Sequence, residues 1–254
     1  MAYSPDTRTY APASAANASG LDAGLRAYML RVYNWMCSGL ALTGIIAYAV
    51  ANTQLINLFY RMVQTPAGYR LQPTGLGFIA MIAPLAFVMV LSFGVNRLSR
   101  PATQALFWAF AAVMGASLAN IFIIYEQASI ARVFFIAAAT FGGMSLYGYT
   151  TRADLSRMGS FLMMGLIGIV LASLVNIFIG STAVQFAISV IGVVVFVGLT
   201  AYDTQRIKAD YLSYAYAEGT EEAGKRSVLD ALALYLNFVN LFQLLLSFMG
   251  QRQN

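Results

Sequence analysis

Asp203 is the residue of this chain whose position most strongly suggests chemistry. It follows a run of 45 residues, 158–202, that contains no Asp, Glu, Lys or Arg. One membrane crossing needs about 20 mostly apolar residues, so this run predicts two crossings with a turn at residues 180–182. An ionisable group in or beside lipid is costly, which makes Asp203 a candidate for binding an ion or a proton.

The residues around Asp203 leave two interpretations open. Arg206 and Lys208 follow closely, so the carboxylate can pair locally as an ordinary residue of the membrane surface. A carboxylate near a helix C-terminus, however, is unfavourable because the helix dipole is negative there. The second interpretation therefore predicts a cation from another helix, or a bound metal ion, beside Asp203.

The composition indicates an integral membrane protein. The chain is 59% hydrophobic and 10% charged, with a mean hydropathy of +0.69, whereas soluble domains carry roughly 25% charged residues. Long apolar runs are typical of helices rather than of the short alternating strands of a membrane barrel. We therefore expect an all-α bundle that follows a disordered cytoplasmic tail at 1–20 and fills residues 21–254. The charge-free runs predict seven spans, at about 28–50, 75–96, 102–124, 130–150, 159–179, 183–205 and 230–250.

The distribution of positive charge predicts the orientation. Eleven of the 15 Lys and Arg residues fall on the side of the N-terminus and four on the other side. The positive-inside rule then places the N-terminus in the cytoplasm and the C-terminus outside. The net charge of +5 is explained by this signal and by an anionic inner leaflet, without a nucleic-acid partner.

Missing residue types exclude several kinds of chemistry. The chain has no histidine, so it lacks the usual haem ligand and the commonest zinc ligand, and histidine proton relays and Ser–His hydrolysis are excluded. Cys37 is the only cysteine, and the two lysines lie between the sixth and seventh spans, so neither a cysteine metal cluster nor a retinal Schiff base in the last span is expected. Without a base nearby, Ser145 is expected to be a packing residue. We expect neither an enzyme nor a bound cofactor.

A polar stripe marks the seventh predicted span. Asn237, Asn240, Gln243 and Ser247 recur at steps of three, three and four, which places them on one helical face. Contact between side-chain amides and lipid tails is unfavourable, so this face should point into the bundle and the helix should be central. Hydrogen bonds between helices would explain the stripe as well as an ion pathway would.

Three segments resemble signatures of the Bax inhibitor-1 family, in its bacterial branch. Segment 198–207 reads GLTAYDTQRI and resembles the family's sixth-span signature. Segment 231–242 reads ALALYLNFVNLF and resembles its seventh-span signature, and 147–156 reads YGYTTRADLS and resembles the loop after the fourth span. The resemblance covers roughly residues 25–250.

The resemblance implies a seven-helix fold with the last helix at the centre, in a bacterial inner membrane, and a slow, pH-sensitive calcium leak. In the family, an aspartate on span six and another on span seven face each other and share a proton, because like charges at close range raise one pKa. In the closed form, the sixth-span aspartate binds an arginine on the second span. Asp203 matches that aspartate and would contact calcium transiently, and Arg97 is the candidate arginine.

This chain departs from the family at the second acid, which is Asn237 here. An amide can donate a hydrogen bond to Asp203, but it cannot share a proton, so we expect a weaker pH response and poorer cation binding. Asp230 lies two turns earlier, about 10 Å along the helix, and could partly substitute. A favourable charge at a helix N-terminus explains Asp230 equally well, just as an ordinary positive-inside arginine explains Arg97.

Three functions are compatible with these features. A passive calcium-permeable leak fits best, because the chain shows no nucleotide-binding loop. A regulator of a membrane-bound AAA protease is the alternative, since some bacterial relatives resemble such modulators and a protease can grip a disordered tail. A proton-coupled carrier fits least well, because only one acid is convincingly within the membrane.

Overall fold

The fold is a bundle of seven long helices. The computed structural model describes residues 13–65, 68–94, 97–214 and 220–253. Within these residues, seven helical segments are long and apolar enough to cross a membrane, which confirms the predicted fold class. The long helices are α1 (Ala13–Ala51), α3 (Gly75–Gly94), α4 (Arg100–Leu118), α6 (Gln127–Thr150), α7 (Ser156–Ile179), α8 (Thr182–Tyr214) and α9 (Thr220–Met249). The short helix α5 (Ile121–Ile124) completes the third span after α4.

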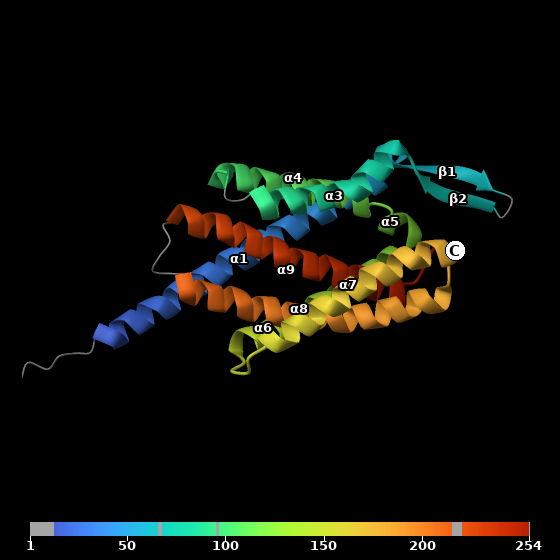
Figure 1. Cartoon of the computed structure of the whole chain (residues 1–254). Coiled ribbons are helices and arrows are strands. Elements are labelled where there is room, and N and C mark those ends of the chain that lie inside the picture. The colour runs from blue at the N-terminus through green and yellow to red at the C-terminus, as the bar shows by residue number, and fades with distance from the viewer. Residues whose placement is uncertain (1–12, 66–67, 95–96, 215–219, 254) are drawn as a thin grey trace, which may run out of the picture.

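The connection between the first two spans contains a hairpin that the sequence analysis did not predict. After the short helix α2 (Ile56–Phe59), strands β1 (Tyr60–Thr65) and β2 (Gly68–Pro73) pair antiparallel. Gly68 has a φ of +110°, a conformation that favours glycine, so the strand reverses there. The hairpin projects beyond one end of the bundle (Figure 1).

Three predicted boundaries were wrong in the same direction, because the helices continue past the apolar runs. The predicted tail 1–20 is helical from Ala13, and the predicted loop 206–229 is helical in every described residue. Alanine, leucine, glutamate, lysine and arginine are good helix formers, so hydropathy marks where the lipid ends and not where the helix ends. Residues 1–12 and 215–219 lie outside the described part of the chain.

α9 is the most deeply packed of the spans. Half of its most apolar stretch is buried, against 17–39% for the other six. It contacts α1, α4, α6 and α8, and Figure 1 shows it running between the α3–α4 pair and the α7–α8 pair. The hydroxyl group of its fully buried Tyr235 lies 2.7 Å from Oγ1 of Thr43 on α1. A buried hydroxyl needs such a partner, so this contact fixes α9 against α1.

A glycine lets α6 and α8 approach closely. A Cβ atom on Gly148 of α6 would lie 2.2 Å from the carbonyl oxygen of Ala201 on α8, so only glycine fits at this crossing. One turn earlier on α6, the hydroxyl group of Ser145 lies 3.0 Å from that of Thr204 on α8. The crossing therefore brings α6 beside the residue that follows Asp203.

The C-terminal residues are held at the end of the bundle that carries the hairpin. The backbone N–H of Glu126 donates to the carbonyl oxygen of Gln251 at 3.0 Å, and that of Gln253 donates to Ile124 at 3.0 Å. Tyr125 and Arg252 form an antiparallel bridge between these two hydrogen bonds. The segment that follows α9 is therefore bound to the junction of α5 and α6.

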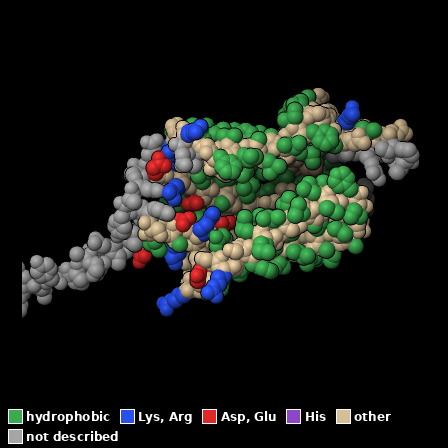
Figure 2. Space-filling model, in the orientation of Figure 1, with side chains coloured by type: hydrophobic (Ala, Val, Ile, Leu, Met, Phe, Trp, Pro, Cys, Tyr) green, Lys and Arg blue, Asp and Glu red, His purple; other side chains and the backbone are tan. Residues whose placement is uncertain are grey.

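Polar and apolar side chains are separated along the bundle. On the face shown in Figure 2, most charged side chains gather at the end opposite the hairpin, and hydrophobic side chains cover the middle. Exposed large residues such as Phe78, Phe135 and Phe178 belong to this apolar surface. The separation fits a belt that faces lipid, with the charged end in water.

Candidate functional site

Asp203 lies inside α8 and not at its end. The helix continues for eleven residues beyond it, to Tyr214, and the Asp203 side chain is only 13% exposed. The argument from the dipole of a helix C-terminus was therefore wrong, because it placed the end of the sixth span too early. The side chains that surround the Asp203 carboxylate must therefore stabilise it.

Both carboxylate oxygens of Asp203 have partners. The side-chain amide of Asn237 on α9 donates to Oδ2 at 2.7 Å, and Nη2 of Arg206 lies 3.0 Å from Oδ1. Asn237 is itself buried. The contact between the sixth and seventh spans that was expected from the sequence is therefore present.

The cation beside Asp203 comes from its own helix. Arg206 lies three residues further along α8, a spacing at which side chains meet on one helical face. This ion pair confirms the first interpretation, local pairing, and takes the place of the expected cation from another helix. Nε of Arg206 is buried and has no hydrogen-bond partner among the described residues, and the guanidinium also attracts the carboxylate of Asp230.

Arg97 lies apart from this pair. It lies between α3 and α4 and is exposed, and α3 packs chiefly against α4. The carboxylate of Asp203 pairs with Arg206 in this conformation. Binding of Asp203 by Arg97 would require a conformation other than this one, and it remains a prediction.

Asp230 is the second acid of the site. It lies ten residues inside α9, which begins at Thr220, so its interpretation as a helix N-terminal charge was wrong. Oη of Tyr28 on α1 donates to its Oδ2 at 2.6 Å, and the ring of Tyr28 packs 4.9 Å from that of Tyr211 on α8. Asp230 is therefore held between α1 and α8, on the side of the site nearer the N-terminal end of α9.

The polar stripe of α9 is buried only in part. Asn237 is buried and Asn240 and Gln243 are half-buried, whereas Ser247 is exposed. Ser189 donates to Ser247 across the α8–α9 contact at 3.4 Å. Ser247 therefore faces α8 as expected, but it remains exposed.

A chain of hydroxyl groups beside the site was not predicted. Oη of Tyr33 on α1 lies 2.5 Å from Oγ of Ser145 on α6, and Ser145 lies 3.0 Å from Oγ1 of Thr204 on α8. Thr204 also donates to the carbonyl oxygen of Thr200. Three helices are therefore joined through Ser145, next to Asp203. The residues next to Ser145 in the sequence do not indicate that it joins three helices, because its partners Tyr33 and Thr204 are distant in the sequence.

Comparison with known proteins identifies the family. The family described as inhibitor of apoptosis-promoting Bax1 matches residues 25–254. The inner membrane protein YbhL of Escherichia coli (strain K12) is 47% identical over 233 residues, which are 91% of this chain and 94% of YbhL. RP147 of Rickettsia prowazekii is 46% identical, covering 92% of this chain and 93% of its own length. A membrane protein of Streptococcus pyogenes, SpyM3_0260, is 35% identical, with 91% and 95% covered. The chain therefore belongs to the Bax inhibitor-1 family of membrane proteins.

Proposed function

We propose that this protein is a passive, calcium-permeable leak that is closed at the end of the bundle carrying Asp203. The observation that carries the proposal is the double engagement of the Asp203 carboxylate, by Asn237 of α9 and by Arg206 of α8. The resemblance to the Bax inhibitor-1 family supplies calcium as the ion. By the charge distribution, this end faces the cytoplasm, in an inner membrane.

Arg206 closes the pathway because it takes the place of a permeating cation. Its guanidinium is attracted by Asp203 and Asp230, which come from two helices that contact each other. Calcium prefers carboxylate and amide oxygens, so an entering ion must displace Arg206 to reach them. The leak is slow because the protein's own cation is tethered at the site and competes with calcium at every passage.

The pH response follows from the single acid at this contact. Asn237 has no proton to exchange with Asp203, and the other acid, Asp230, is bound to Tyr28 on a different side of the site. Two facing carboxylates would share a proton and respond steeply to pH. We therefore expect the calcium leak to change less with pH than in relatives with two facing acids.

The test is calcium entry into liposomes that contain only the purified protein and an internal calcium indicator. Asp203→Asn removes the carboxylate that pairs with Arg206 and that calcium would bind, so calcium entry should fall severalfold. The control is Asp154→Asn, which removes a carboxylate from the exposed loop before α7. The backbone N–H of Ser156 donates to Asp154 and holds the pKa of that carboxyl below its ordinary value, so it is ionised throughout the assay. Equal entry for both variants would refute the proposed role of Asp203.

The alternative function, a regulator that binds a membrane-bound AAA protease, predicts different results. The purified protein would then show no calcium entry above that of empty liposomes. It would co-purify with the protease from membranes, and deletion of residues 2–12 would abolish the association. This deletion leaves α1 whole, because the helix begins at Ala13.

A further inference from the structure

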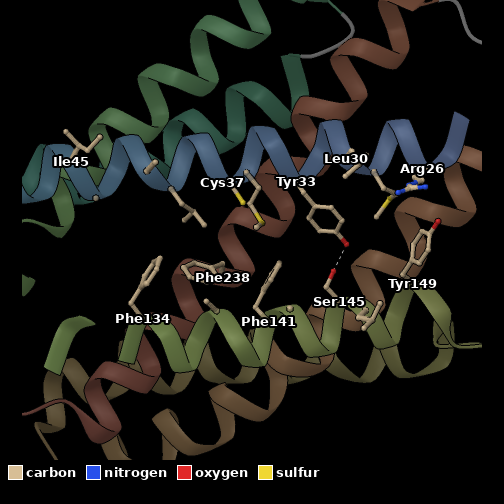
Figure 3. A pocket seen from close by; sticks show the side chains of 18 residues that line it. Arg26, Leu30, Tyr33, Cys37, Ile45, Phe134, Phe141, Ser145, Tyr149 and Phe238 are labelled. Atoms are coloured by element: carbon tan, nitrogen blue, oxygen red, sulfur yellow. Dashed lines mark hydrogen bonds between the residues drawn. The ribbon is translucent and has the colours of Figure 1, made fainter. Parts of the chain in front are cut away.

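A long groove separates α1 from α6 on the outside of the bundle. Its volume is about 950 Å³, near the top of the range of roughly 300–1,000 Å³ for sites that hold small ligands. Figure 3 shows the side chains of α1 and α6 facing each other across it, with Phe238 of α9 between them. Cys37 and Phe141 lie in its middle, and Ile45 and Phe134 mark one end.

The groove has the dimensions and surface of a lipid site. From Arg26 to Ile45, the α1 residues that line it span about 28 Å at 1.5 Å per residue, close to the hydrocarbon thickness of about 30 Å. Apart from Arg26 and a few hydroxyl groups, its walls are apolar. Leu30, Ile45 and Phe134 are exposed, so the groove is open along its side to the lipid around the bundle.

Among the residues that line the groove, only Arg26 is charged, and it lies at one end. Arg26 is exposed there, and among the described residues it makes no hydrogen bond or ion pair. Nζ of Lys208 lies 5.0 Å from the ring centroid of Tyr149, which lines the same end, and donates to the Tyr149 carbonyl oxygen. Arg26 therefore lines this end of the groove, and Lys208 contacts Tyr149 of the same end. Guanidinium and ammonium groups both bind phosphate oxygens.

We propose that this groove binds an anionic glycerophospholipid of the leaflet at the N-terminal end of the bundle. Its phosphate contacts Arg26 and lies near Lys208, and an acyl chain lies between α1 and α6 beside Cys37 and Phe141. Charge complementarity favours an anionic headgroup, because cations close to a membrane surface attract anionic lipids of that leaflet. The proposal does not depend on calcium conduction.

Native mass spectrometry of the full chain tests the headgroup. The protein is given equal amounts of phosphatidylglycerol and phosphatidylcholine with identical acyl chains, and the lipid that remains bound is identified. We expect the wild type to retain phosphatidylglycerol at least fivefold over phosphatidylcholine. Arg26→Gln should abolish this preference, whereas Arg31→Gln, a loss of charge on the same helix outside the groove lining, should preserve it. Equal retention of the two lipids by the wild type would overturn the proposal.

Two glycines of α6 test the position of the acyl chain. Gly142 lines the groove and Gly143 does not, and neither has an atom within 4 Å of an added Cβ. Gly142→Leu should lower phosphatidylglycerol retention about tenfold, and Gly143→Leu should leave it unchanged. The unique Cys37 provides a second readout, since phosphatidylglycerol should slow its alkylation by a membrane-permeant maleimide at least threefold. Equal retention by both glycine variants, or no protection of Cys37, would place the lipid elsewhere.

Discussion

Removal of the Arg206 guanidinium is the most direct test of how the pathway is closed. In Arg206→Gln, the 3.0 Å contact between Nη2 and Oδ1 of Asp203 is lost. A hydrogen bond between charged groups contributes roughly 1.5–3 kcal/mol, and an exposed ion pair only about 0.2–1 kcal/mol. The Arg206 side chain is 40% exposed, so we take about 1–2 kcal/mol as the loss for the closed form. Because 1.4 kcal/mol is a factor of ten, the closed form becomes roughly 5- to 30-fold less favoured.

The expected result is a rise of about tenfold in the initial rate of calcium entry into liposomes, at constant pH and protein content. The uncompensated carboxylate of Asp203 attracts calcium and adds to this rise. Arg152→Gln, in the exposed loop before α7, is the control for removing a charge at the same end. Arg97→Ala is measured in parallel, because binding of Asp203 by a second-span arginine predicts a rise for that variant instead. A rise for Arg97→Ala without one for Arg206→Gln would refute the role given to Arg206.

Three further outcomes follow from the contacts of α6 and α9. Asn237→Asp places a second carboxylate against Asp203, so the pair shares a proton and calcium entry measured from pH 5 to 8 should depend more steeply on pH; an unchanged profile would contradict this. Gly148→Ala puts a Cβ 2.2 Å from a carbonyl oxygen of α8 and should destabilise the protein by about 1–3 kcal/mol, seen as a lower melting temperature in detergent, whereas Gly143→Ala should melt like the wild type. Tyr235→Phe removes a buried hydroxyl group from a 2.7 Å contact with Thr43 and should cost about 1 kcal/mol; an unchanged melting temperature would show that this contact does not stabilise the fold.

The spans and the central contact could be predicted from the sequence. Charge-free runs of sufficient length mark the lipid-crossing segments whatever their packing, because burial of charge in lipid is costly. The turn at residues 180–182 is present as a break between α7 and α8, with Gly180 in the left-handed conformation at φ +65°. The pairing of Asp203 with Asn237 followed from the family's paired positions and the polar face of α9.

The partners of the charged groups could not be predicted in the same way. A hydropathy pattern predicts the end of a span where polar residues begin. Helices α8 and α9 extend beyond those points, so Asp203 and Asp230 lie in helix interiors. The contact of Tyr28 with Asp230 joins residues 202 positions apart, which a single sequence cannot pair. Local pairing of Asp203 with Arg206 was one of the two interpretations that the sequence offered. Its preference over pairing with Arg97 depends on helix packing, since α3 packs chiefly against α4.

The attachment of the C-terminal segment anchors one end of α9. Backbone hydrogen bonds hold residues 251–253 at the junction of α5 and α6, so a tilt of α9 would turn about that end. Asn237 lies thirteen residues before Gly250, about 20 Å from this pivot at 1.5 Å per residue. A tilt of about 5° therefore displaces Asn237 by roughly 2 Å over that radius, enough to separate its amide from the carboxylate that it binds. We therefore expect that a change at the end of the bundle that carries the hairpin alters the contact between Asn237 and Asp203.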